Sequence, residues 1–431
     1  MPEKTEKTAY RLQSLSSGKI FDDEGWTLEA NGESSAGLIR AVYEKKQLNP
    51  GDDALGIYKF SDWLPILKQL KGSSAPLTYR SEGLAGALGL KNLYITFSGY
   101  WPERDARMRT CSFKETEAYT VAGRFNPEDH HVLVVASAGN TARAFARVCS
   151  DNDIPLLLCV PEDNIHALWF DEEIKDNVKL IVSKKGSDYF DAIHLSNVAC
   201  GSERFIPEGG AKNVARRDGM GTTVLSAATH IGAIPDYYFQ AVGSGTGAIA
   251  AWEANLRLIE DGRFGSHKMK LMVSQNYPFT PIYDAWKAGS RKILAMDDDV
   301  ARKQVAEIDA KVLSNRKPPY EVIGGLFDAL SDSEGDVLLA NNEESIIAND
   351  LFQKTEGIDL HPAAAVATAT LIQAVRNKSI APEANIMLNI TGGGEERFKQ
   401  EKELHFLKPS LVFDYHPEPQ EVIEKIEKLF Q

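Results

Sequence analysis

Lys114 is the residue whose neighbours in the sequence best suit covalent chemistry. It follows Thr110–Phe113, which are three small hydroxyl or thiol residues and an aromatic one, and it opens a helical pattern from Glu115 to Gly123. A lysine amine beside apolar surface loses solvation of its charged form, so its pKa falls and the neutral amine can condense with an aldehyde. Most lysines at a helix start are simply solvated, so this motif needs support from elsewhere in the chain.

Two further stretches, Ser137–Thr141 and Gly243–Gly247, each follow an apolar run and precede a helical pattern. A turn of this kind can present backbone N–H groups to an anion or a polar ring substituent. Taken alone, Asn140 more often serves local backbone bonding, and glycines also suit a tight turn without a ligand. A nucleophilic lysine, an asparagine turn and a glycine-rich phosphate loop, in this order, predict a phosphorylated aldehyde cofactor, pyridoxal phosphate.

The glycine loop has a rival interpretation as a dinucleotide fingerprint. Gly243, Gly245 and Ala248 match the spacing of that motif, which also requires an acidic residue about twenty positions later, at the tip of the next strand. Glu260 has the right distance but lies in the helical run, whereas the next strand pattern ends near Gln275. Nicotinamide binding is therefore the weaker interpretation, and a single phosphate is the stronger one.

Thr391 follows an apolar strand pattern and precedes three glycines. It can be an ordinary strand-end hydroxyl. In a pyridoxal site, a neutral hydroxyl at the ring nitrogen does not favour ring protonation, which suits elimination and replacement chemistry over transamination. His361, at the head of an alanine-rich helical pattern, fits a helix cap and a pocket-lining residue equally well.

Three arginines just before the candidate nucleophile offer bidentate docking for phosphate, sulfite or carboxylate groups, although a solvated loop is an equally good explanation. These residues are Arg104, Arg107 and Arg109. A second basic cluster contains Lys212, Arg216 and Arg217.

Composition excludes several classes of partner. The 431 residues carry a formal charge of −13, which disfavours nucleic acid and anionic membranes as partners. The four cysteines lie far apart and form no metal or disulfide pattern, so we expect no metal. The N-terminus has no apolar signal core, and no apolar run approaches the roughly 18 residues of a membrane span. A cytoplasmic location is expected.

Strand and helix patterns alternate regularly from Val132 onwards, which predicts an α/β fold with mostly parallel sheets. Upstream of this region, the polar and apolar alternation over residues 10–26 predicts a hairpin. The spacing of Leu38, Ile39, Val42 and Tyr43 predicts a helix.

Together these motifs resemble the landmarks of fold-type II pyridoxal phosphate enzymes, in particular the threonine synthase-like family and, within it, the cysteate synthases of coenzyme M biosynthesis. The resemblance rests on Ser112–Lys114, Ser137–Thr141, Gly243–Gly247 and Thr391–Gly394, and it extends over nearly the whole chain. It implies two interwoven three-layer lobes of the tryptophan synthase β type. It divides the chain into an N-terminal hairpin and helices (1–70), a large cofactor-binding lobe (71–126 and 206–431) and a small mobile lobe (127–205).

The resemblance also implies roles. Lys114 would hold the cofactor and act as general base in replacing the phosphate of O-phosphoserine by sulfite, and Ser137 and Thr141 would meet the substrate carboxylate. We expect Arg104, Arg107 or Arg109 to receive the phosphate or sulfite, and the chain to form a homodimer or larger homo-oligomer. The cofactor contacts would come from Asn140, Gly243, Ser244, Gly245, Thr246, Gly247 and Thr391.

The chain departs from threonine synthases at three places. Glu115 and Thr116 follow the lysine in place of an Asp-Arg-like pair, His361 stands where Glu is common, and Gly393 stands where a histidine is common. These changes disfavour the threonine-forming reaction. Threonine synthase, a phosphoserine-dependent sulfhydrylase, a dehydratase and a catalytically silent amino-acid-binding relative remain as alternatives.

Overall fold

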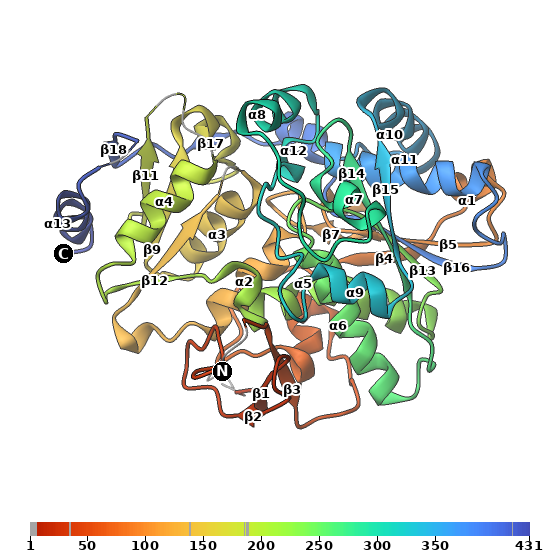
Figure 1. Cartoon of the computed structure of the whole chain (residues 1–431), viewed down its shortest axis with the longest axis horizontal. Coiled ribbons are helices and arrows are strands. Elements are labelled where there is room, and N and C mark those ends of the chain that lie inside the picture. Colours follow the sequence, from red (N-terminus) through yellow and green to blue (C-terminus); the bar gives the residue numbers. More distant parts are fainter. Residues whose placement is uncertain (1–6, 34–35, 138, 185, 187–188, 416) are drawn as a thin grey trace.

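Two mainly parallel sheets, one of six strands and one of five, form the centre of the molecule, and an antiparallel three-stranded sheet lies beside them (Figure 1). This computed structural model describes residues 7–33, 36–137, 139–184, 186, 189–415 and 417–431. Ala138, within the predicted asparagine stretch, lies outside the described residues. The regular alternation of strands and helices confirms the predicted α/β class.

The six-stranded sheet has the order β15-β14-β13-β16-β5-β4, and all neighbours are parallel except β4 and β5. Helices cover both faces, with α11 and α10 above the sheet and α5, α6 and α9 below it in Figure 1. Burial on both faces explains why the strands are nearly continuous apolar runs. The strands are β4 (Leu77–Arg80), β5 (Asn92–Phe97), β13 (Tyr237–Ala241), β14 (Lys270–Asn276), β15 (Asp336–Ala340) and β16 (Asn385–Ile390). The helices are α5 (Val214–Ile231), α6 (Thr246–Asp261), α9 (Leu326–Asp332), α10 (Asn342–Glu356) and α11 (Pro362–Arg376).

The five-stranded sheet has the order β12-β8-β9-β11-β18 and is wholly parallel. Helices α3 and α4 pack on it, and α13 packs on α4. Strand β18 and helix α13 therefore belong with the small sheet, although the division of the sequence placed residues 206–431 in the large lobe. The elements are β8 (Val132–Ala136), β9 (Leu156–Pro161), β11 (Val178–Ser183), β12 (Phe205–Pro207), β18 (Leu411–Phe413), α3 (Asn140–Asp151), α4 (Tyr189–Ala199) and α13 (Pro419–Leu429).

The N-terminal sheet pairs β1 (Tyr10–Ser14) with both β2 (Ile20–Phe21) and β3 (Ile39–Tyr43). The β1–β2 pair confirms the predicted hairpin. The predicted helix at residues 38–43 is wrong, because residues 39–43 form β3. Buried and half-buried residues alternate along β3, which is the period of a strand paired with β1.

Helix α2 (Lys114–Arg124) connects the two halves of the molecule, because it packs on α3 of the small sheet and on α5 of the large one. It is buried along almost its whole length. The candidate nucleophile is its first residue, so packing on both sides fixes the position of that residue.

Short elements complete the chain. They are α1 (Gly83–Leu88), α7 (Pro281–Lys287), α8 (Asp298–Glu307), α12 (Glu395–Glu401), the pair β6 (Tyr100–Trp101) and β7 (Ala106–Arg107), the pair β10 (Trp169–Phe170) and β17 (His405–Phe406), and the 3₁₀ helices η1 (Asp53–Trp63), η2 (Pro102–Arg104), η3 (Pro127–Asp129), η4 (Glu162–Ala167), η5 (Gly210–Lys212) and η6 (Lys311–Leu313). Within the described ranges, no helix has both the length and the apolar character required to cross a bilayer.

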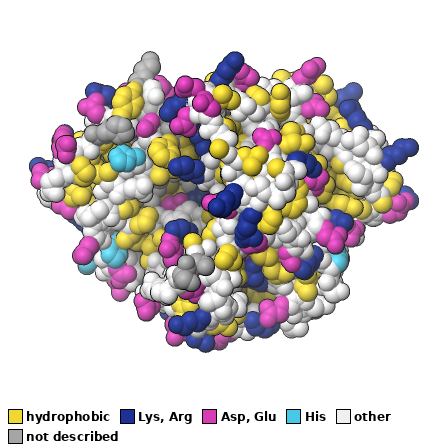
Figure 2. All heavy atoms as spheres, in the orientation of Figure 1, with side chains coloured by type: hydrophobic (Ala, Val, Ile, Leu, Met, Phe, Trp, Pro, Cys, Tyr) yellow, Lys and Arg dark blue, Asp and Glu magenta, His cyan; other side chains and the backbone are white. Residues whose placement is uncertain are grey.

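The surface charge is unevenly distributed. Figure 2 shows lysine and arginine side chains gathered near the middle of one face, where the two halves of Figure 1 meet. The chain as a whole carries a formal charge of −13. Because the chain is acidic overall, a site for an anionic ligand must be formed by individual cations close to it.

The crossing of α2 and α5 depends on a glycine. A Cβ on Gly219 would lie 2.4 Å from the Thr116 carbonyl oxygen and 2.5 Å from Thr120 Oγ1. We predict that Gly219→Ala destabilises the fold by about 2 kcal/mol, because overpacking forces the helices apart. The control is Gly221→Ala on the same helix, where a Cβ would be 3.4 Å from the Ala250 carbonyl oxygen and the change should be neutral or stabilising. Urea denaturation measures both, and equal stabilities would contradict the prediction.

Candidate active site

The segment before Lys114 is held against the stretch after β16 by short antiparallel pairing. The Phe113 N–H donates to the Thr391 carbonyl at 2.9 Å, and the Gly393 N–H donates to the Cys111 carbonyl at 3.2 Å. Ser112 and Gly392 are paired directly. This contact places Lys114 next to the predicted Thr391 stretch, far away in the sequence.

Glycines make this approach possible. A Cβ on Gly392 would lie 3.0 Å from both the Cys111 carbonyl oxygen and His361 Cβ, and one on Gly393 would lie 2.7 Å from the Asp359 carbonyl oxygen. Both positions are so tight that any side chain would push the neighbouring backbone away. The same pairing brings His361 to the site, since its N–H donates to the Gly392 carbonyl at 3.0 Å.

The Lys114 amine lies in a mostly buried, charged environment. Its side chain is 19% exposed, and its Nζ atom lies 3.3 Å from Glu117 Oε2 and 4.8 Å from the centre of the Phe113 ring. Burial lowers the pKa of Lys114, and the Glu117 carboxylate only partly opposes that shift. The fraction of neutral, nucleophilic amine is therefore larger than for a surface lysine.

Glu117 is the next member of a buried chain of charges. Its carboxylate is fully buried, accepts a hydrogen bond from Thr141 Oγ1 at 3.1 Å and forms an ion pair with Arg216 at 3.1 Å. Arg216 also pairs closely with Glu208. Burial alone would lower the pKa of Arg216, but the two carboxylates hold it above its ordinary value. The Arg216 guanidinium is thus kept charged, and only the Glu117 carboxylate lies between it and the Lys114 amine.

Asn140 begins α3, and its amide lies between the side chains of Arg143 and His361. Its Oδ1 accepts from Arg143 Nη2 at 3.0 Å, and its Nδ2 lies 3.3 Å from His361 Nε2. His361 caps α11, where its Nδ1 accepts from the Ala363 N–H at 3.2 Å. Burial lowers the pKa of His361 to about 4, so its imidazole is neutral at physiological pH. The structure therefore confirms the helix-cap role of His361 and adds a contact to Asn140.

The glycine loop lies where it was predicted, between β13 and α6. Gly245 has φ of 78° and precedes the first turn of α6, and the hydroxyls of Ser244 and Thr246 are 2.9 Å apart. The loop is tied to the lysine segment through packing, because Phe113 forms a small cluster with Met220 and with Ala250 of α6. The N-terminus of a helix such as α6 is a suitable place to hold a phosphate.

The three arginines upstream of Lys114 engage other partners. Arg104 stacks on the rings of Tyr79 and Trp101 at 4.3 and 4.6 Å. Arg107 pairs with Asp105 at 2.6 Å. Arg109 forms ion pairs with three carboxylates, those of Asp151, Asp171 and Glu172.

Of the predicted substrate contacts, Thr141 reaches the Lys114 environment through Glu117, whereas Ser137 accepts from the Gly139 N–H at 3.2 Å. The sequence did not single out Glu117, and it did not connect Arg216 with Lys114. Glu117 had a readable signal, its position three residues after Lys114 on the same helix face. Arg216 had been noted only as part of a basic cluster, and nothing local connected it to the lysine.

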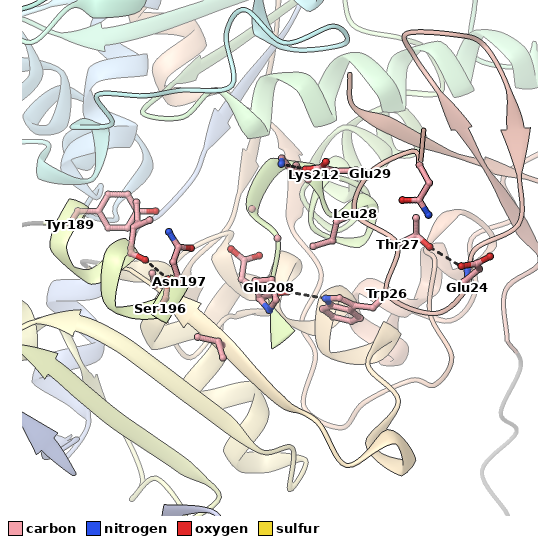
Figure 3. Close-up of a pocket in the computed structure, with 17 residues that line it drawn as sticks. Glu24, Trp26, Thr27, Leu28, Glu29, Tyr189, Ser196, Asn197, Glu208 and Lys212 are labelled. Carbon is pink, nitrogen blue, oxygen red and sulfur yellow. Dashed lines mark hydrogen bonds and ion pairs between the residues drawn. The ribbon is translucent and has the colours of Figure 1, made fainter. Parts of the chain in front are cut away.

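A cavity of about 780 Å³ opens beside this chain of charges (Figure 3). It lies between the N-terminal segment, the end of β8, α4 and the loop after β12. Its lining includes Trp26, Tyr189 and Lys212, together with Glu208, which pairs with Arg216. The cavity therefore approaches the Lys114 environment from the side of the Arg216 guanidinium.

Comparisons with known proteins place the chain in a class. Residues 78–392 match the family model described as "Pyridoxal-phosphate dependent enzyme". Maize serine racemase superposes with a TM-score of 0.59 at 14% identity, covering 76% of this chain and 91% of that one. A tomato threonine deaminase gives a TM-score of 0.55 at 18% identity, covering 75% and 87%. These likenesses show the fold, and the chain is a fold-type II pyridoxal-phosphate-dependent enzyme.

Closer relatives narrow the class. A protein of Methanocella paludicola named cysteate synthase is 49% identical over 91% of this chain and 92% of its own length. One of Methanosarcina acetivorans with the same name is 46% identical over 93% and 96%. The chain belongs to the cysteate synthase family, which confirms the resemblance seen in its sequence.

The residues present fit pyridoxal phosphate. A mostly buried primary amine at a helix start suits the aldehyde, and the loop before α6 suits the phosphate. An amide at Asn140 and a hydroxyl at Thr391 are available for the ring. Among the described residues, no group of three or more His, Cys, Asp and Glu side chains is arranged to hold a metal ion.

The lowered pKa of His361 predicts a pH effect on stability. The neutral imidazole is favoured in the fold, so stability from this residue is present above pH 6.5 and is lost as the pH falls towards about 4. Asn in place of His361 keeps a helix-capping side chain but does not titrate in this range. Between pH 6.5 and pH 4 we predict that the free energy of unfolding falls by ~3 kcal/mol more in the wild type than in His361→Asn. Urea denaturation across that range measures the difference. Parallel pH profiles would contradict it.

Proposed function

We propose that this protein replaces the phosphate of O-phospho-L-serine by sulfite, giving L-cysteate and inorganic phosphate as part of coenzyme M biosynthesis. The name of its relatives supports the product. The structural observation that carries the proposal is the position of the Lys114 amine, 3.3 Å from a buried carboxylate that is itself paired with Arg216. A base thus lies beside a cation suited to anionic substrates.

The chain's own residues can perform the steps. Bound pyridoxal phosphate supplies an electron sink for negative charge at Cα. The free Lys114 amine takes the α-proton, and the Glu117 carboxylate stabilises the resulting ammonium. The Cβ–O bond then breaks and phosphate leaves with its electron pair. The sulfite sulfur forms the new bond to Cβ, and Lys114 returns its proton to Cα.

We further propose that Asn140 contacts the ring 3-oxygen, that Gly243–Gly247 binds the cofactor phosphate and that Thr391 contacts the ring nitrogen. Ser137 and Thr141 are proposed to bind the substrate carboxylate. The cavity of Figure 3 offers a route to the charged chain. A cytoplasmic location, a homo-oligomeric state and a small lobe that moves against the large one belong to the same proposal.

The activity test is direct. The purified protein is incubated with O-phosphoserine and sulfite, and mass spectrometry should identify cysteate. Lys114→Ala should abolish product, whereas Lys175→Ala, which removes a surface lysine paired with Asp153, should leave the rate unchanged. Parallel incubations use sulfide in place of sulfite, or O-phosphohomoserine alone. If cysteine is the main product, the protein is a sulfhydrylase; if threonine is the main product, it is a threonine synthase. Either result would overturn the proposed reaction.

Arg216 is our candidate for binding the phosphate or sulfite group, because its guanidinium is charged, its side chain is 12% exposed and it pairs with Glu208, which lines the cavity. We predict that Arg216→Lys raises KM for O-phosphoserine or sulfite by about tenfold or more, because lysine lacks the bidentate fork. Arg217→Lys is the control on the same helix, since Arg217 is fully buried but pairs with Glu253.

The outcome also decides between this residue and the earlier candidates. If Arg104, Arg107 or Arg109 receives the anion, alanine at those positions raises the Michaelis constants and Arg216→Lys leaves them unchanged. Steady-state kinetics with each substrate varied separately gives the answer.

A further inference from the structure

Arg143, on the first turn of α3, carries a buried guanidinium group. Its side chain is 2% exposed, and its guanidinium lies 3.9 Å from the centre of the Trp169 ring. Nη2 donates to the Thr110 carbonyl at 3.0 Å and to Asn140 Oδ1 at 3.0 Å. Nη1 donates to the Ala167 carbonyl at 3.0 Å, and Nη2 lies 3.4 Å from a Glu395 carboxylate oxygen.

These partners come from separate parts of the site. Thr110 lies four residues before Lys114, Asn140 begins α3 of the small sheet, and Glu395 begins α12 just after the glycines that follow Thr391. One guanidinium therefore links the lysine segment, the asparagine turn and the threonine–glycine stretch. Because the guanidinium of Arg143 is planar and rigid, its hydrogen bonds fix the positions of these three segments relative to one another.

The contact also decides which way the Asn140 amide faces. A guanidinium has only hydrogen-bond donors. It therefore bonds to the amide oxygen of Asn140 and not to the amide NH₂ group. The Nδ1 atom of His361 accepts from the Ala363 N–H, so the proton of the neutral ring is on Nε2. This Nε2–H group would also bond best to the amide oxygen, which would turn the oxygen towards His361 and away from Arg143. The charge-assisted bond from Arg143, at 3.0 Å, is the stronger of the two. The NH₂ group is thereby kept on the side away from Arg143.

We propose that Arg143 is a positioning residue that fixes the Asn140 amide so that an N–H, and not the carbonyl oxygen, is presented to the 3-oxygen of pyridoxal phosphate. The inference rests on the cofactor role proposed for Asn140, but it does not depend on which substrates are used. Without Arg143, the Asn140 amide can rotate so that its oxygen faces the 3-oxygen of the cofactor. Two oxygen atoms that carry only acceptor lone pairs repel each other.

The test compares two side chains of similar size at position 143. Arg143→Gln retains an N–H donor that can reach Asn140 at the i,i+3 spacing, whereas Arg143→Met has none. Both variants lose the charge and the planar fork to the same extent. Arg147→Met is the control, since Arg147 lies one turn further along α3, is also buried and pairs with Asp151.

Two readouts are used on the full chain. The dissociation constant of pyridoxal phosphate is measured by titrating cofactor-stripped protein, and the pH dependence of the visible absorption band is measured on the loaded protein. We expect Arg143→Met to weaken cofactor binding by about tenfold and to shift the pH midpoint of the band, and Arg143→Gln to lie close to the wild type. Arg147→Met should change neither quantity. Equal values for the Met and Gln variants at position 143 would overturn the proposal.

A double-mutant cycle with Asn140→Ala separates positioning from general structural support. If Arg143 acts through Asn140, the Met substitution has no further effect on cofactor affinity in the Asn140→Ala background. An undiminished effect there would overturn the proposal. If cysteate formation itself fails, these cofactor readouts still decide the role of Arg143, so the two failures are distinguishable.

Discussion

The site depends on a short antiparallel contact between the backbone before Lys114 and the backbone after β16. Two hydrogen bonds, at 2.9 and 3.2 Å, join segments that are far apart in the sequence. The contact is close because Gly392 and Gly393 carry no side chains. It fixes the reactive amine relative to Thr391 and His361 at the same time. Any change that separates these backbones would therefore disturb several functional groups together.

Charge is the second constraint. The chain is acidic overall, yet the residues around Lys114 form an alternating series in which Glu117 lies between the amine and Arg216, and Arg216 lies between two carboxylates. Buried ions are stable only when they are paired, so each member depends on the next. An anionic substrate that reached Arg216 would compete with Glu117 and Glu208 for the guanidinium. Binding of the substrate and the charge state of the lysine are thus physically connected.

The sequence predicted the parts of the site whose signal is local. Lys114, the turn at Asn140, the loop at Gly243–Gly247 and the strand end at Thr391 are each recognisable from a few neighbouring residues, and the regular alternation of strands and helices after Val132 is present in the structure. The resemblance to a family added the cofactor and the fold type, and the comparisons confirmed both.

What could not be predicted depends on contacts between distant residues. The spacing at residues 38–43 fits a helix and a strand, and pairing with β1 decides for the strand. Arg109 is close to Lys114 in sequence, but its guanidinium turns towards Asp171, whereas Arg216 reaches the site from far along the chain. Arg143 resembles any helical arginine until its partners from other segments are assembled around it. Proximity along the chain is a poor guide to long, charged side chains, because their partners are chosen by the tertiary structure.

The pairing of β18 with β11 has a consequence for how the protein is made. Until residues 411–413 have left the ribosome, β11 presents an open row of N–H and carbonyl groups, because its partner is synthesised long after it. The small sheet therefore spends most of translation with an unpaired edge, which other nascent chains can join. In this protein the lobe that carries the asparagine turn completes its hydrogen bonding only after the larger lobe has been synthesised.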